Sequence, residues 1–206
     1  MRLALSALLL SLTGCSVIEP PRQVVQSTER DWRAVATPSD RARLRGWRSA
    51  FTSALAAARA GGHSDEIDRE GALLRPDSAL GGGSIRNGMY RCRVIKVGAK
   101  SEGLLDYVAY PYFNCRVQQE RQLQGFAKLT GSQRHVGLIF PGDAIRQVFL
   151  GTLMLGDEDR AMQYGVDPER DVAAFVERIG PERWRMVMPS PHFESQLDVM
   201  ELVPAS

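Results

Sequence analysis

The feature that most constrains the fold is a change of periodicity after residue 84. From Ile85 onward, eight short runs rich in Val, Ile, Phe and Tyr alternate with clusters of Gly, Pro, Asp and Ser. In the run RWRMVMP, the residues Trp184, Met186 and Met188 share one face of the expected strand. Because no helix-length segment separates most of the runs, neighbouring strands are expected to pair antiparallel. The pattern predicts a mainly β (α+β) chain in which residues 85–206 form an up-and-down antiparallel β-barrel of about seven or eight strands, with a sandwich as the alternative.

The segment before the expected barrel has a helical period. Thr37 can cap a helix that begins at Pro38, and Asp40 is placed to reach back to the cap. Apolar residues then recur at three- and four-residue steps as far as Gly61–Gly62: Leu44, Trp47, Phe51, Leu55 and Ala58. A second, shorter helix is expected between Ser64 and Leu74. The glycines at 81–83 predict a boundary between this helical segment, residues 37–80, and the barrel domain. The apolar stripe is expected to plug one end of the barrel or to cover its outer face.

Arginines are frequent in both segments. The first helix carries a basic face: Arg41, Arg43, Arg45, Arg48 and Arg59. This face could lie on anionic lipid, but a solvated face is the favoured interpretation. The expected strands also contain arginines: Arg91, Arg93, Arg116, Arg178, Arg183 and Arg185. Those that point inward could bind an anionic ligand, whereas outward arginines form a solvated face, and the outward arrangement is favoured.

The N-terminus predicts export and lipidation. Arg2 precedes an apolar stretch, Leu3 to Leu12, that is too short to span a bilayer and fits a signal peptide. The following Leu12-Thr13-Gly14-Cys15 resembles a bacterial lipobox. The resemblance implies removal of residues 1–14 and acylation of Cys15, by chains such as palmitate. Residues 15–36 then form a lipidated tether, and Ser16 implies the periplasmic face of the outer membrane.

The charge composition disfavours one class of binding partner, nucleic acid. The chain of 206 residues has 26 basic and 24 acidic side chains, so no global basic field suggests nucleic acid. The lipobox resemblance implies that the membrane is a partner, reached through the lipid on Cys15. A small ligand or an envelope protein is a further possible partner.

The cysteine count indicates one disulfide. With Cys15 lipidated, two of the three cysteines are left, Cys92 and Cys115. In an oxidising compartment these two are expected to form a disulfide between neighbouring strands, with two free thiols as the alternative. The three histidines are scattered and show no metal-ligand spacing, so no metal site is predicted.

No catalytic or cofactor-binding residues are predicted. The nucleophile motif G-x-S-x-G is absent, and Gly81–Ser84 has the composition of a linker. Residues 191–195 contain His192, Glu194 and Ser195, but side chains so close together on an extended chain point to alternating sides. A loop between the last two strands is the favoured interpretation of this stretch. No cofactor is expected, and an enzyme is the less favoured class.

Four stretches carry a family resemblance: LTGSQR, FLGTL, ERIG with RWR, and the ending ESQLDVMELVP. They are similar to a family of small proteobacterial lipoproteins, of the sphingomonad type, that contains a domain of unknown function. In shape, a small exported barrel with one early disulfide looks like the bacterial protease-inhibitor barrels and lipocalin-like folds, which implies binding. The favoured hypothesis is a non-enzymatic envelope lipoprotein that binds a small ligand or a protein. The alternatives are a cell-envelope hydrolase and a structural or assembly factor.

Overall fold

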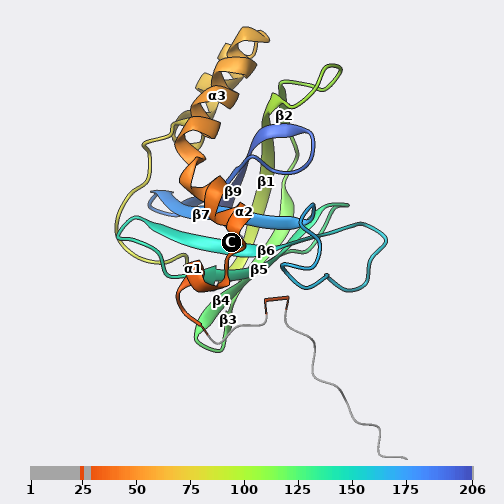
Figure 1. Cartoon of the computed structure of the whole chain (residues 1–206). Coiled ribbons are helices and arrows are strands. Elements are labelled where there is room, and N and C mark those ends of the chain that lie inside the picture. The colour runs from red at the N-terminus through yellow and green to blue at the C-terminus, as the bar shows by residue number, and fades with distance from the viewer. Residues whose placement is uncertain (1–23, 26–28, 206) are drawn as a thin grey trace, which may run out of the picture.

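The structure, a computed structural model, describes residues 24–25 and 29–205. Its first part is helical, with the elements α1 (Trp32–Val35), α2 (Pro38–Arg45), α3 (Trp47–Ala60), α4 (Ser64–Glu70) and the 3-10 helix η1 (Gly71–Leu74). The strands follow: β1 (Gly88–Ala99), β2 (Tyr107–Ala109), β3 (Phe113–Glu120), β4 (Leu123–Lys128), β5 (Arg134–Phe140), β6 (Arg146–Met154), β7 (Asp171–Gly180), β8 (Arg183–Pro189) and β9 (Ser195–Pro204). Figure 1 shows the helices gathered outside the curved sheet.

The sheet closes into an antiparallel barrel. Its strands follow the order β1-β3-β4-β5-β6-β7-β8-β9, and β9 pairs back with β1 from Tyr90–Pro204 to Ala99–Ser195. The short strand β2 extends the sheet beside the far half of β1. The predicted mainly β fold, with an up-and-down barrel after N-terminal helices, is therefore confirmed. All eight predicted strands are present, and consecutive strands pair antiparallel because each is joined to the next by a local connection.

Alternation along the strands separates the barrel interior from its surface. Trp184, Met186 and Met188 all belong to the interior cluster, as their shared face predicts. Gly137 on β5 faces Gly151 on β6, where a Cβ atom on Gly137 would lie 2.2 Å from the Leu150 carbonyl oxygen. Glycine is therefore required at this close approach of two strands.

The predicted helix start is present, and the first helix differs from the prediction in one respect. Thr37 Oγ1 accepts a hydrogen bond from the Asp40 backbone N–H at 3.1 Å. The helical run is broken at Gly46 into α2 and α3, because glycine weakens a helix interior. The predicted second helix is also divided, into α4 and η1 at Gly71, which has a φ of +58°.

The apolar stripe of α3 covers the outer face of the barrel. Phe51 and Ala54 are fully buried against outward-facing residues such as Val97 and Val199 of β1 and β9. A second outer cluster joins Val25, Trp32 and Leu44 to β5, β6 and β7. Residues of the helical segment and of the barrel strands thus pack together in two apolar clusters. The predicted boundary at residues 81–83 between separately folding units stays a prediction.

Candidate functional site

The middle of the barrel is filled by side chains. Phe126 and Phe149 meet edge to face at 5.7 Å, and Tyr90 and Trp184 do so at 6.1 Å. Methionines fill the space between these aromatic pairs: Met186, Met188 and Met200. A small barrel with this interior is a packed core. A ligand of appreciable size must therefore bind at an end of the barrel or on its outer surface.

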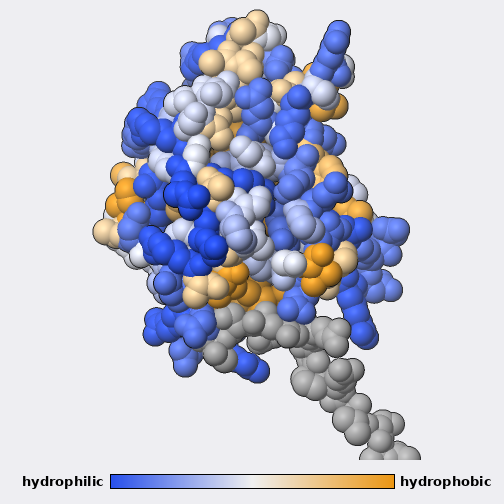
Figure 2. Space-filling model, viewed as in Figure 1, coloured by the Kyte–Doolittle hydropathy of each residue, from blue (hydrophilic) through white to orange (hydrophobic). Residues whose placement is uncertain are grey.

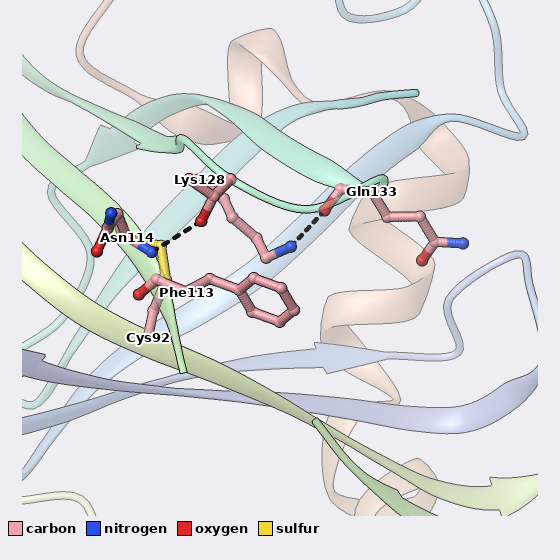
Figure 3. The surroundings of a disulfide bond; sticks show 7 residues. Cys92, Phe113, Asn114, Lys128 and Gln133 are labelled. Atoms are coloured by element: carbon pink, nitrogen blue, oxygen red, sulfur yellow. Dashed lines mark hydrogen bonds between the residues drawn. A yellow bond between two sulfur atoms is a disulfide. The ribbon is translucent and has the colours of Figure 1, made fainter. Parts of the chain in front are cut away.

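The disulfide lies inside this core. Cys92 of β1 and Cys115 of β3 are joined, with Cα atoms 5.9 Å apart, and both are fully buried. Figure 3 shows the bond beside Phe113 and the side chain of Lys128. The bond therefore links β1 covalently to β3, the strand with which this part of β1 pairs.

One end of the interior is polar and charged. The Lys96 ammonium donates to the Asp198 carboxylate at 2.9 Å, across the β1–β9 pair, and Asp198 also accepts from the Ser195 hydroxyl. Burial raises the pKa of Asp198. Burial also opposes the charge on Lys96, but the carboxylates of Asp198 and of Glu194, which lies 3.2 Å from the ammonium, together more than offset this effect and leave the pKa of Lys96 raised. The pair seals this end of the barrel as a hydrogen-bonded ion pair.

Lys128 and His135 complete the polar end. They lie one step beyond the Ala127–Val136 pair of β4 and β5. Lys128 donates to the Gln133 carbonyl oxygen at 2.8 Å, and its ammonium lies 3.7 Å from the centre of the Phe113 ring (Figure 3). Burial lowers the pKa of Lys128 to about 8, and burial lowers that of His135 to about 3. His135 is therefore a neutral imidazole, and its buried Nδ1 makes no hydrogen bond to the described residues.

The space beside His135 is small. A cavity of about 30 Å³ lies between His135, Lys96, Asp198 and the loop at His192–Phe193. This volume holds about two water molecules, which would satisfy the His135 nitrogen. Among the described residues, no group of three or more His, Cys, Asp or Glu is placed to hold a metal ion.

The larger cavity is a groove on the outer surface, which we call the arginine groove. It lies between the first three helices and the β5–β6 connection, has a volume of about 470 Å³, and is lined by Trp32, Arg33, Arg41, Arg45, Trp47 and Arg146. The buried side chains of Leu44 and Val148 and the half-buried ring of Phe175 form its apolar base. Figure 2 shows strongly hydrophilic side chains over the region where Figure 1 places α1 and α2.

The arginines of the groove differ in how far they are neutralised. Arg146 pairs with Glu177 at 2.6 Å, and its guanidinium stacks 4.4 Å from the centre of the Trp47 ring. Arg33 lies 4.5 Å from the centre of the Trp32 ring and 3.8 Å from Asp31 in an exposed pair.

The two arginines that α2 contributes to the groove, Arg41 and Arg45, have no acidic partner among the described residues. Arg41 donates to the backbone carbonyls of Arg33 and Ala36, and it forms no ion pair with a carboxylate of the described chain. Arg45 is exposed and has neither a hydrogen bond nor an ion pair to the described residues. The groove therefore has an excess of positive charge beside two indole rings.

The strand arginines lie mostly on the outer face, as alternation predicts, but one of them is not solvated. Arg185 is 0% exposed and pairs with Glu177, which is also 0% exposed, at 2.6 Å. Its other donors reach backbone carbonyls of η1 and the residues after it, including Leu73 at 2.9 Å and Pro76 at 2.9 Å. The helical segment covers this arginine, and strand periodicity cannot reveal such a cover.

The predicted site residues fall in different places. Cys15 lies outside the described residues, whereas Cys92 and Cys115 form the expected disulfide. His192 and Glu194 lie on the β8–β9 connection, while Ser195 begins β9, buried beside Asp198. Arg41 and Arg45 belong to the basic helix face that the sequence indicates. Arg33 and Arg146 were not predicted, because only the fold brings them to that face.

Comparison with known proteins gives one match. A family model described as Domain of unknown function (DUF4893) matches residues 32–202, which include both the helices and the barrel. Neither the curated proteins nor the solved structures contain a significant match. Within the described part of the chain, no helix is both long and apolar enough to cross a bilayer.

Proposed function

The chain belongs to this family of unknown function, and we propose that it is a lipid-anchored protein of the cell envelope that binds an anionic ligand on the outside of a filled barrel. The observation that carries the proposal is the arginine groove. Four guanidinium groups converge on one cavity, and those of Arg41 and Arg45 have no acidic partner in the described chain. Guanidinium groups bind phosphates and carboxylates through paired, charge-assisted hydrogen bonds.

The anchoring part of the proposal has two supports. The first is the lipobox-like sequence ending at Cys15, preceded by a short apolar stretch. The second is the buried disulfide between Cys92 and Cys115, since such bonds persist in oxidising compartments outside the cytosol. An anchored binding protein needs a ligand site that faces outward, and the arginine groove meets this requirement.

A cell-envelope hydrolase is the second candidate. It is favoured by the polar end of the barrel, because shifted pKa values cluster at catalytic sites. However, Ser195 is only 2% exposed, and the Asp198 carboxylate that accepts its hydroxyl hydrogen is also paired with the Lys96 ammonium at 2.9 Å. The serine is therefore shielded from a substrate, and its acceptor is held in an ion pair. The polar end is better explained as a charged seal of the barrel.

Titration with a soluble anion tests the proposed function. Glycerol 1-phosphate is added to the full-length chain in uncharged detergent micelles, and binding is followed by tryptophan fluorescence and by the thermal midpoint. We expect saturable binding that is weakened at least about tenfold in the double variant Arg41→Gln/Arg45→Gln. The matched control, Arg69→Gln/Arg160→Gln, removes the same charge from exposed arginines that do not line the groove. Equal weakening in both double variants would reduce the effect to net charge and contradict the proposal.

A further inference from the structure

We infer that the ligand of the arginine groove is the phosphate headgroup of an anionic membrane lipid, so that the groove docks the barrel onto the bilayer to which the chain is tethered. This inference rests on the proposed function and names the source of the anion. Three features of the described chain support it: the charge of the groove, its apolar surface and size, and its position relative to the tether.

The charge of the groove is complementary to a phosphate. Arg41 is held by two backbone carbonyls, those of Arg33 and Ala36, so its guanidinium is positioned without being neutralised. Arg45 projects from the same helix, four residues further on, and is exposed. Asp143 is the acidic residue of the lining, and its carboxylate accepts the backbone N–H groups of Ile145 and Arg146 at 2.9 and 2.8 Å. Positive charge therefore remains in excess where a ligand would sit.

The apolar part of the groove distinguishes a lipid from a free ion. The volume of about 470 Å³ is within the range of sites for whole organic ligands and far exceeds the need of one phosphate group. The half-buried rings of Trp47 and Phe175 provide apolar surface for a glycerol backbone and the first methylene groups, above the buried side chains of Leu44 and Val148. Trp32 and Trp47 place indole rings beside the arginines, and tryptophan is the side chain that favours the boundary between headgroups and hydrocarbon.

The position of the groove agrees with a membrane ligand. Val24 and Val25 are the first residues that the structure describes. Val25 belongs to the same apolar cluster as Trp32, which lines the groove. If Cys15 carries the lipid, Val25 follows it by ten positions, and a chain of that length spans at most about 35 Å. Tethering at this distance gives the groove a high effective concentration of headgroups.

Mixed micelles test the inference with the full-length chain. Phosphatidylglycerol or phosphatidylcholine is added to uncharged detergent micelles containing the protein, and tryptophan fluorescence is recorded. Trp184, buried inside the barrel, supplies a constant background, so changes report on Trp32 and Trp47. We expect a saturable change with phosphatidylglycerol and none with phosphatidylcholine.

Arg41→Gln/Arg45→Gln should require at least about ten times more phosphatidylglycerol for the same fluorescence change, whereas Arg69→Gln/Arg160→Gln should behave as wild type. Arg45→Gln alone should show a smaller loss. Because Arg45 is exposed and has no hydrogen bond or ion pair to the described residues, this variant is expected to fold and so controls for misfolding of the double variant.

The outcomes separate this inference from the proposed function. Free glycerol 1-phosphate that binds as tightly as phosphatidylglycerol would identify a soluble anion as the ligand, which overturns the lipid inference and leaves the proposed function standing. Fluorescence that responds to neither compound would overturn both. A response to phosphatidylglycerol that both double variants share equally would show attraction by net charge alone, and it would also overturn the docking site.

Discussion

The buried cations Arg185 and Lys128 differ in whether a carboxylate neutralises them. Arg185 is fully buried, but Glu177 and the carbonyls after η1 satisfy its donors. Lys128 is also buried, yet its ammonium has the Gln133 carbonyl and the Phe113 ring as its neighbours and no paired carboxylate among the described residues. A buried charge without a counter-charge is destabilising. The two residues should therefore respond in opposite ways to substitution.

Lys128 should make stability rise with pH in the alkaline range. Its pKa is lowered to about 8 in the folded chain, below the unfolded value of about 10.4. Between these values the unfolded chain binds more protons than the folded chain, so the free energy of unfolding increases with pH, by at most about 1.4 kcal/mol per pH unit. Below pH 8 the charged lysine destabilises the fold. Urea unfolding between pH 7 and 10 measures the effect.

Two variants at this position separate charge from shape. Lys128→Met should be more stable than wild type at pH 7 and should lose the alkaline rise attributed to Lys128. Lys128→Arg keeps a cation that does not titrate in this range, so it should lose the rise without gaining stability. A rise that persists unchanged in both variants would assign it to another group.

At the scale of elements, α3 is the main cover of the barrel. Phe51 is fully buried between α3 and the barrel, where it also lies against the Arg185 guanidinium, 5.3 Å from the centre of its ring. Phe51→Ala should lower the free energy of unfolding by about 3 to 5 kcal/mol, because it removes a large buried ring and leaves a cavity. The neighbouring Ser53→Ala, at an exposed position of the same helix, should change it by less than about 0.5 kcal/mol. Chemical denaturation of both variants decides whether α3 is docked as described.

The disulfide should stabilise the pairing of β1 with β3. Its cysteines are 23 residues apart, and in the chain-entropy model closing such a loop stabilises a protein by about 3 kcal/mol. Non-reducing peptide mapping should recover the Cys92 and Cys115 peptides joined, and Cys92→Ala/Cys115→Ala should lower the free energy of unfolding by a comparable amount. Recovery of both residues as free thiols from envelope fractions would contradict this.

The eight barrel strands could be predicted from the sequence, but the short strand β2 and the contacts between the helices and the barrel could not. Alternation such as Trp184-Met186-Met188 is a local signal, and local connections make the antiparallel order follow from the chain. β2 has three residues, too few to show a period. The cover over Arg185 and the groove between Arg41 and Arg146 depend on contacts between segments about a hundred residues apart. No periodicity of one segment carries such information.

At the scale of the whole molecule, one apolar cluster fills the barrel and two further clusters lie between its outer face and the N-terminal segment. The inner cluster is built entirely from residues between Ile85 and Leu202. The outer clusters join the helices and Val25 to the strands. The family match, which begins at Trp32, includes both parts. The arginine groove lies where helices and barrel meet, so the proposed binding site requires the whole assembly.

Attachment to the membrane is the prediction that concerns the chain as a whole. Intact-mass analysis of the wild type should show a chain that begins at Cys15 and carries acyl chains, while Cys15→Ala should retain residues 1–14 and carry no lipid. An unmodified Cys15 in the wild type would contradict the proposal that the protein is a lipoprotein. Ser16→Ala is the control, because it leaves the cysteine in place. The lipidated chain should remain in membrane pellets after a wash in about 1 M salt, since acyl chains hold by hydrophobic burial, whereas attachment through the arginine groove alone should be screened and released.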